Sequence, residues 1–194
     1  TEELGNDRID NCTVSFTDDE TAIERAEYII IALPTPVDDL KNPNLEYIEA
    51  GGEMIGRQMQ EGATVVLEST VYPGATREIL VPTLEESSGL RAGTDFSVGY
   101  SPERLVPGDD EHGLANVVKI VSGDSAAVAA DLEQLYGTVV DAGIHRAPAI
   151  EVAEAAKCLE NIQRDLNIAL VNELAIACNA LGLDTHDVLD AAGT

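Results

Sequence analysis

Basic residues are scarce in this chain. Its 194 residues include 11 lysines and arginines against 36 aspartates and glutamates, which gives a formal net charge of −25. A surface of this charge repels the phosphates of nucleic acids and of anionic membranes, so we expect neither as a partner. Hydrophobic residues make up 44% of the chain, which excludes disorder caused by low hydrophobicity and allows a packed core.

The acidic residues are dispersed along the chain, whereas there are only three lysines, Lys41, Lys119 and Lys157. Dispersed carboxylates without a tail-like block favour a protein of a high-salt cytoplasm, where hydrated acids keep the surface soluble and salt screens their repulsion. An ordinary acidic protein at moderate salt is the alternative. The charge pattern therefore predicts a halophilic protein without settling the point.

Cysteine and histidine are also rare, at three residues each. Cys12, Cys158 and Cys178 show no CxxC or metal-ligand spacing and the histidines are scattered, so we expect no metal site. An odd number of cysteines without a signal peptide argues for reduced thiols and a cytoplasmic location. No apolar run is long enough to span a bilayer, which predicts no membrane contact.

A glycine-rich GxGxxG turn, which normally opens a dinucleotide-binding sheet, is missing as well. The glycine pair Gly51–Gly52 lies in a helical stretch instead. At the other end, a helical unit starts at Asp184 or Thr185 and the chain stops before that unit is packed. Both ends are therefore expected to be cut from a longer protein.

What the sequence does contain is a regular alternation of strands and helices. Short apolar, β-branched runs indicate strands buried on both faces, as in a parallel sheet. We expect strands at 28–33, 63–70, 95–100, 116–123 and 138–143, and helices at 18–27, 42–60, 77–89 and 124–137. This alternation predicts an α/β fold, a partial Rossmann-like parallel sheet with helices on both faces.

Three polar loops directly follow strands of this predicted sheet: "PTP" at 34–36, "ESTVYPG" at 68–74 and "SPERLVPG" at 101–108. Ligands of open α/β sheets bind outside the carboxyl ends of the strands. We therefore expect Thr35, Thr70 and Glu103 close together at one edge. Each has an ordinary alternative, as a turn residue, a loop cap or a solvated carboxylate.

Nothing interrupts a helical pattern from residue 149 to 181. Pro148 is tolerated in a first turn, and Gly182 is a stop signal. The second half of the helix is apolar on more than one face and must be covered, so we expect a homodimer through 149–181. The expected domains are 1–147, the Rossmann-like part, and 148–194, a central dimerisation helix with the start of a helical middle domain.

Six segments in order carry a resemblance that covers nearly the whole chain: "YIIIALPTPVDD", "VVLESTVYPGAT", "VGYSPERLVPGD", "VKIVSG", "YGTVVDAG" and the stretch from "EVAEAAKCLENIQRDL" to the C-terminus. They resemble the UDP-glucose/GDP-mannose dehydrogenase family, most closely its UDP-N-acetylhexosamine 6-dehydrogenases. The resemblance implies NAD-dependent oxidation of the sugar C6 alcohol to a carboxylate in two steps, through a cysteine thiohemiacetal and thioester, for polysaccharide or glycan biosynthesis. UDP-glucose as substrate, and a non-catalytic dimerisation module, remain as alternatives.

The resemblance also implies roles for residues of the three loops. Thr35, Ser69 and Thr70 match positions that contact NAD, and Thr70 also matches a threonine that holds the hydrolytic water. Glu103 matches a carboxylate of the acid–base network that serves thioester hydrolysis and lines the sugar. Arg104 and Leu105 match contacts to the sugar or diphosphate.

On the long helix, Lys157 matches a lysine that stabilises the alkoxide as hydride leaves. Asn161 lies four residues later on the same face and matches a donor to the same oxygen, and Arg164 could also face the substrate. A surface lysine paired with Glu154 or Glu160 is the alternative for Lys157. The family's catalytic cysteine motif is not found, and Cys158 and Cys178 do not match it, so we expect this chain alone to be inactive.

Overall fold

The computed structural model describes residues 14–104, 113 and 115–194, and the candidate Leu105 lies outside these ranges. The strands form one five-stranded sheet in the order of the sequence: β1 (Tyr28–Ile31), β2 (Thr64–Leu67), β3 (Ser97–Tyr100), β4 (Lys119–Gly123) and β5 (Ile144–Arg146). The helices are a 3-10 helix (Glu20–Arg25), α2 (Glu46–Gln58), a π-helical turn (Thr76–Leu80) that continues into α3 (Val81–Ser88), α4 (Ala126–Gly137), α5 (Ile150–Leu181) and α6 (Thr185–Ala192).

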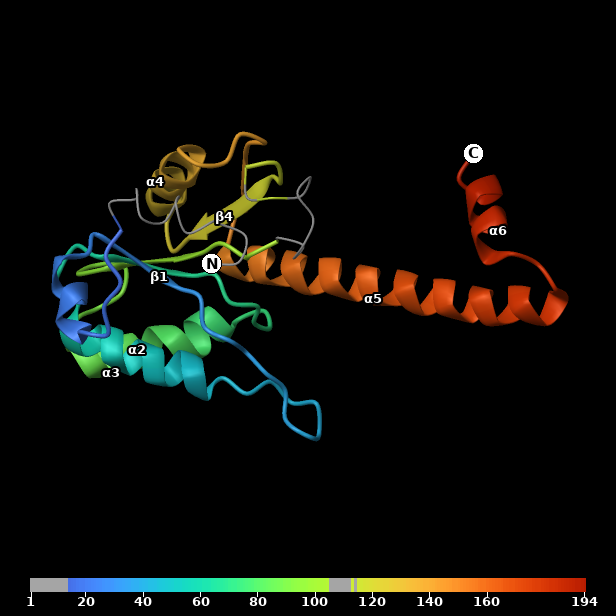
Figure 1. Cartoon of the computed structure of the whole chain (residues 1–194). Coiled ribbons are helices and arrows are strands. Elements are labelled where there is room, and N and C mark those ends of the chain that lie inside the picture. Colours follow the sequence, from blue (N-terminus) through green and yellow to red (C-terminus); the bar gives the residue numbers. More distant parts are fainter. Residues whose placement is uncertain (1–13, 105–112, 114) are drawn as a thin grey trace.

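Helices cover both faces of this sheet. Figure 1 shows α2 and α3 on one face and α4 on the other, while α5 leaves the body and carries α6 at its far end. The layered arrangement of sheet and helices confirms the α/β, Rossmann-like fold class that the alternation of strands and helices predicted.

Strand β2 lies at the centre of two hydrophobic clusters because its side chains alternate between the two faces. Val65 and Leu67 pack in the cluster beneath α2 and α3, and Val66 packs with Leu132 of α4 and Val121 of β4. All five of these side chains are fully buried. The sheet and its covering helices therefore form a packed hydrophobic core, which can hold the strand-end loops in place.

The sheet is not wholly parallel, which corrects the prediction. Strands β1, β2 and β3 are parallel, but β4 runs antiparallel to β3, with Gly99 opposite Gly123 and Tyr100 opposite Ser122. An antiparallel neighbour needs no crossover helix, and the described part of the connection between β3 and β4 contains none. As a result, Lys119 at the start of β4 lies beside the carboxyl ends of β1 to β3.

The strand expected at 138–143 is also wrong. Thr138 ends α4, the following residues form turns, and Gly143 has a φ of 97°, a left-handed conformation that favours glycine. The strand β5 begins one residue later, at Ile144. The prediction relied on the apolar residues of 138–143, but the backbone of this segment forms turns.

Two glycines of α2, Gly52 and Gly56, are explained by close packing against the π-helical turn and α3, while Gly51 faces the side chain of Leu33. A Cβ atom built on Gly56 would lie 2.6 Å from the Cβ of Ser87 and 3.0 Å from the carbonyl oxygen of Leu84, both on α3. A side chain at this position would push the two helices apart. The glycine-rich stretch is thus a surface for close approach between helices.

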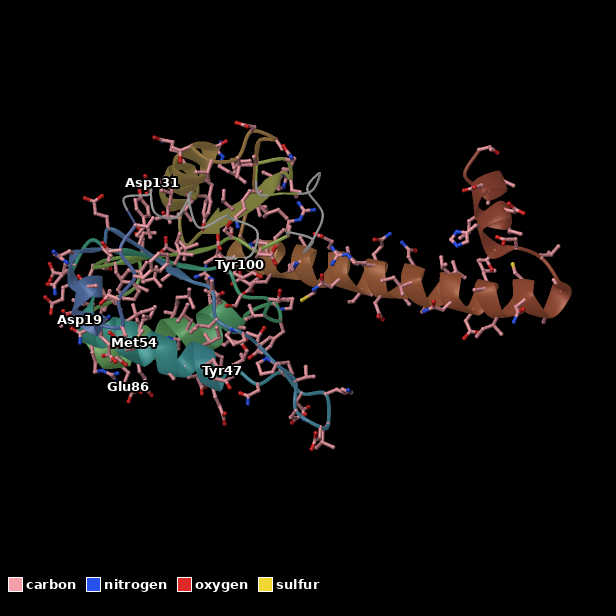
Figure 2. The ribbon with its side chains drawn as sticks, viewed as in Figure 1. Asp19, Tyr47, Met54, Glu86, Tyr100 and Asp131 are labelled. Atoms are coloured by element: carbon pink, nitrogen blue, oxygen red, sulfur yellow. The ribbon has the colours of Figure 1, made fainter. Side chains whose placement is uncertain are left out.

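Helix α5 has the length that the sequence predicted, with Gly182 closing it in the left-handed conformation at a φ of 70°. In its first two turns the buried residues are Ile150, Ala153, Glu154 and Lys157, a stripe that faces the sheet. Beyond that stripe its side chains project from the helix, as Figure 2 shows. None of the helices in the described ranges has both the length and the hydropathy needed to cross a membrane.

Candidate active site

The loops that follow β1 and β2 are joined by two hydroxyl groups. The Oγ1 of Thr35 donates to the carbonyl oxygen of Thr70 at 2.7 Å. The Oγ of Ser69 donates to the carbonyl of Leu33 at 2.7 Å and accepts from its amide at 3.0 Å. The buried hydroxyl of Ser69 therefore holds the two loops together, whereas Thr70 is exposed at the sheet edge.

The loop after β3 is fixed to the end of β2. The amide of Ser101 donates to the carbonyl of Leu67 at 3.0 Å, and the amide of Glu103 donates to the carbonyl of Glu68 at 3.3 Å. The side chain of Glu103 is exposed. The structure thus brings the three predicted loops together at one edge, while the roles of Thr35, Thr70 and Glu103 stay predictions.

Helix α5 is locked onto the loop after β2 by the carboxylate of Glu154, which is fully buried. Its two oxygens accept from the amide of Gly74 at 2.6 Å, the amide of Thr76 at 3.0 Å and the hydroxyl of Thr76 at 2.6 Å. One turn further on, the Sγ of Cys158 contacts the carbonyl of Val71 at 3.3 Å. These contacts set the first turns of α5 directly beside Thr70.

Lys157 lies between these two anchoring residues and is only 5% exposed. Glu154 is engaged with the loop after β2 and Glu160 with arginines, so neither pairs with this lysine. Within the described ranges, Lys157 has no hydrogen bond or ion pair with another side chain. The alternative of a surface lysine in an ion pair is therefore wrong.

A largely covered lysine whose ammonium has no carboxylate partner in the described ranges can direct that charge at a bound group. The position of Lys157, at the junction of α5 with the loop that carries Thr70, makes it the strongest candidate in this site.

The other candidates on α5 belong to a network centred on Glu160. Its carboxylate accepts from the Nε of Arg104 at 2.7 Å and from Arg164 at 2.8 Å, and Arg164 also donates to the Oδ1 of Asn161 at 3.3 Å. A further hydrogen bond joins Arg104 to the carbonyl of Val118 at 2.9 Å. Arg104 thus ties the loop after β3 to α5, and Arg164 orients the amide of Asn161.

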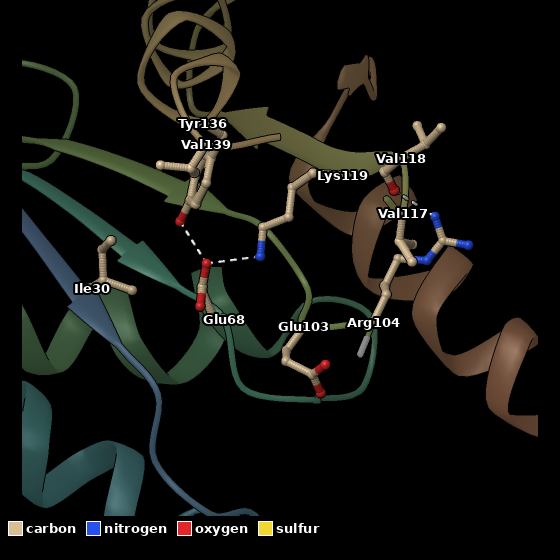
Figure 3. Close-up of a pocket in the computed structure, with 9 residues that line it drawn as sticks. All are labelled: Ile30, Glu68, Glu103, Arg104, Val117, Val118, Lys119, Tyr136 and Val139. Atoms are coloured by element: carbon tan, nitrogen blue, oxygen red, sulfur yellow. Dashed lines mark hydrogen bonds and ion pairs between the residues drawn. The ribbon is translucent and has the colours of Figure 1, made fainter. Parts of the chain in front are cut away.

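Beside these loops, on the α4 side of the sheet, lies a cavity of about 340 Å³ that Glu103 and Arg104 help to line. Figure 3 shows Lys119 and Tyr136 converging on Glu68 within it. The Oε1 of Glu68 accepts from Lys119 at 2.8 Å and from the hydroxyl of Tyr136 at 2.7 Å. Burial, and then the bond to Glu68, raise the pKa of Tyr136, so its hydroxyl remains a neutral donor.

Sequence reasoning did not single out Glu68, Lys119 or Tyr136. Lys119 and Tyr136 lie 51 and 68 residues after Glu68 along the chain, so no local spacing joins the three. One signal was available, because a lysine within the apolar run "NVVKIVSG" must find a partner once that strand is buried.

The cysteines and a possible metal site add no chemistry here. Burial raises the pKa of the Cys158 thiol, with the negative charge of Glu154 acting in the same direction, which makes the reactive thiolate harder to form. In the part of the chain that the structure describes, His, Cys, Asp and Glu side chains form no group that could hold a metal ion. The candidates that the structure describes therefore offer hydroxyls, carboxylates, an amide and the cations of Lys157, Arg104 and Arg164.

Two family models match this chain. The first describes the NAD binding domain of the UDP-glucose/GDP-mannose dehydrogenase family and matches residues 2–140. The second describes the central domain of the same family and matches residues 151–194. Neither match tests the domain boundary predicted between residues 147 and 148.

Curated relatives agree with these matches. The chain is 49% identical over 181 residues to a UDP-N-acetyl-D-glucosamine 6-dehydrogenase of Pseudomonas aeruginosa, a match that covers 93% of this chain and 43% of the relative. It is 47% identical over 194 residues to the protein CapL of Staphylococcus aureus, covering all of this chain and 46% of that protein. The chain thus spans less than half the length of these relatives.

Solved structures show the same fold. A UDP-D-ManNAc dehydrogenase from Pyrococcus horikoshii superposes with a TM-score of 0.84 at 34% identity, covering 91% of this chain and 42% of that one. A GDP-mannose dehydrogenase from Pseudomonas aeruginosa superposes with a TM-score of 0.81 at 30% identity, over 90% of this chain and 41% of that one.

Proposed function

This chain belongs to the UDP-glucose/GDP-mannose dehydrogenase family, and from that premise we propose that it serves the NAD-dependent oxidation of C6 of a UDP-N-acetylhexosamine to the uronic acid. The observation that carries the proposal is Lys157, which is largely covered beside the loop of Thr70 and forms no ion pair with the residues that the structure describes. A purely structural dimerisation helix has no use for such a group, which argues against the non-catalytic alternative.

The residues at the sheet edge fit one end of NAD. Thr35 and Thr70 present neutral polar groups next to the exposed side chain of Leu33, and the buried Ser69 holds the two loops together beneath them, a set suited to an uncharged ring and its carboxamide. For the pyrophosphate, the described ranges hold no glycine-rich turn at a helix start. We propose these three residues as the nicotinamide-side contacts, and NAD, when bound, accepts the hydride from C6.

Lys157 acts on the substrate oxygen. The C6 alcohol passes its proton to water, and the negative charge that this leaves on the C6 oxygen drives the hydride off C6. A positioned ammonium stabilises that developing charge, because it is already in place and no reorganisation is needed. Asn161, whose Oδ1 accepts from Arg164, would donate from its amide N–H groups to the same oxygen.

Glu103 serves the second half of the reaction in this proposal. Hydrolysis of a thioester requires a base that takes a proton from the attacking water. An exposed carboxylate held at the end of β3, close to the loop of Thr70, suits that task. The hydroxyl of Thr70 both donates and accepts, so it can orient the water. Arg104, Leu105 and Arg164 stay proposed contacts to the sugar nucleotide.

The proposed substrate class is tested by steady-state assays of NADH formation in the full-length protein that carries this chain. We expect kcat/KM to be highest for a UDP-N-acetylhexosamine and lower for UDP-glucose. The 49% identity to a UDP-N-acetyl-D-glucosamine 6-dehydrogenase supports this order. A preference for UDP-glucose would overturn the substrate assignment, and no NADH with any nucleotide sugar would overturn the proposed function.

Replacing Glu103 with glutamine should stall the reaction after oxidation. We expect overall turnover to fall roughly 100-fold, the lower range of general base catalysis, while the first hydride transfer changes little. The covalent sulfur-linked intermediate should then accumulate and appear as a mass increase of the protein after mixing with substrate and NAD. Glu61→Gln, at an exposed turn away from the site, is the matched control. Loss of both steps without an adduct would contradict this role.

We further propose that two copies of the protein pair through α5. Beyond the stripe that faces the sheet, the helix leaves large apolar side chains exposed at Leu159, Ile162, Leu166, Ile168, Leu170, Leu174 and Ile176. An exposed apolar surface of this extent on one helix is typical of an interface. A second α5 fits because the same surface then serves both partners about a twofold axis.

A charge on this surface should separate the pair. Leu166 and Leu170 lie one turn apart and are 63% and 57% exposed, so glutamate at both positions would bury carboxylates in the interface. We expect the unaltered protein to sediment as a dimer at micromolar concentration and the double variant as a monomer. Asn179→Glu adds the same charge to the same helix outside the apolar set and should remain dimeric. A monomeric unaltered protein would refute the proposal.

A further inference from the structure

We propose that Lys119, held by Glu68, is a positioning residue that fixes Glu103 and shields it from the charge of Glu68. This inference rests on the proposed function, because it assigns the source of the geometry and charge balance around Glu103. Glu68 and Glu103 line the same cavity, so an uncompensated Glu68 would leave two negative charges in one cavity.

The ammonium of Lys119 has as many acceptors as it has N–H donors. It donates to the Oε1 of Glu68 at 2.8 Å and approaches the carbonyl oxygens of Ser101 and Pro102 at 3.4 Å each. It also lies 4.9 Å from the centre of the Tyr136 ring, within the range of a cation–π contact. Lys119 is only 5% exposed, and each of its three N–H donors has an acceptor within the protein.

Two of these acceptors are the residues immediately before Glu103. The next amide, that of Glu103 itself, donates to the carbonyl of Glu68. The backbone leading to Glu103 is thus fastened to Glu68 twice, directly through that amide and indirectly through Lys119. A shift of about 1 Å in a catalytic group can cost up to roughly 100-fold in rate, so this fastening bears on catalysis.

Stability alone does not account for the pair. A buried ion pair gains little over an apolar pair of similar size, because desolvation offsets the attraction. The apolar remainder of the cavity wall, Ile30, Val117, Val118 and Val139, would accept aliphatic side chains at these positions. What the ion pair adds is a fixed charge of each sign next to Glu103.

Among the described residues, charged and titratable groups near Glu103 belong to the loops after β2 and β3, to β4, to α4 and to α5. Glu68 follows β2, Lys119 opens β4 and Tyr136 ends α4, while Arg104 is the next residue and is paired with Glu160 of α5. Removing Lys119 leaves Glu68 uncompensated and favours the protonated form of Glu103. Removing the charge of Glu68 instead leaves Lys119 to act on Glu103 and favours its ionised form.

The experiment compares pH profiles of kcat in the full-length protein for K119M, E68Q and the double variant. We expect K119M to lose up to about 100-fold in kcat with little change in KM for the sugar nucleotide. The acid limb of its profile should move to higher pH, that of E68Q to lower pH, and that of the double variant back toward the unaltered position. E68Q preserves the side-chain shape and keeps the test decisive if K119M folds poorly.

K41M makes the same substitution at an exposed turn and should leave activity and profile unchanged. Equal losses of activity without opposite shifts of the acid limb would mean that the pair is only structural, which overturns this inference. Unaltered kcat in K119M would overturn it as well, while the proposed function would stand. If the unaltered protein oxidised no nucleotide sugar, both the proposed function and this inference would be overturned.

Discussion

Replacing Lys157 with methionine is expected to lower kcat by roughly 100- to 1,000-fold in the full-length protein, the loss typical of removing one group that stabilises a developing oxyanion. Binding of the nucleotide sugar should weaken little, because the cation acts mainly on charge that appears in the transition state. Rapid-mixing measurements of the first NADH, alongside equilibrium binding of the sugar nucleotide, separate the two effects.

The same variant should be at least as stable as the unaltered protein. Lys157 is 5% exposed and pairs with no carboxylate in the described ranges, so its replacement removes no ion pair. Methionine keeps the unbranched shape and the packing of the apolar stem. An undiminished melting temperature together with a fall in kcat would mark a residue kept for function rather than for stability. Lower stability with unchanged kcat would contradict the assignment.

Replacing Glu154 with alanine is expected to destabilise the fold by about 3 to 5 kcal/mol. Its carboxylate accepts three hydrogen bonds from Gly74 and Thr76, and its removal leaves two backbone amides and a hydroxyl without partners in a buried place. For a domain of this size, that corresponds to a fall in melting temperature of roughly 10 °C. Urea unfolding at neutral pH measures the change directly.

The matched control lies one turn earlier on the same helix. Glu151 pairs with the Nε of Arg77 at 2.6 Å, but both side chains are more than a third exposed. An exposed ion pair contributes at most about 1 kcal/mol, so Glu151→Ala should change stability far less than Glu154→Ala. Similar losses for both variants would show that Glu154 is not the lock between α5 and the loop after β2.

The elements governed by local rules could be predicted from the sequence. The helix expected at 149–181 is found at Ile150–Leu181, because a permissive proline and a stopping glycine bound an unbroken helical pattern. The edge that gathers Thr35, Thr70 and Glu103 followed from strand order alone. The halophilic interpretation depends on charge composition, and no contact in the structure tests it, so it stays a prediction.

The features that escaped prediction depend on distant partners. Whether β4 runs parallel or antiparallel is decided by the connection that precedes it, and its apolar run reads the same in either direction. The grouping of Glu68, Lys119 and Tyr136 joins three elements that no local spacing relates. Ser69, which stays a proposed contact to the cofactor, also binds both the amide and the carbonyl of Leu33, a pairing that only the folded loops reveal.

Helix α5 behaves mechanically as a lever with a fixed end. Its contacts to the body run from Ile150 to Glu160, and the remaining 21 residues extend roughly 32 Å further at 1.5 Å per residue. A tilt of about 5° around Lys157 would sweep the far end, where α6 hangs, by roughly 3 Å. A group at the pivot hardly moves during such a tilt. Lys157, the proposed catalytic cation, therefore lies in the clamped part of the helix, where forces applied to the far end produce little displacement.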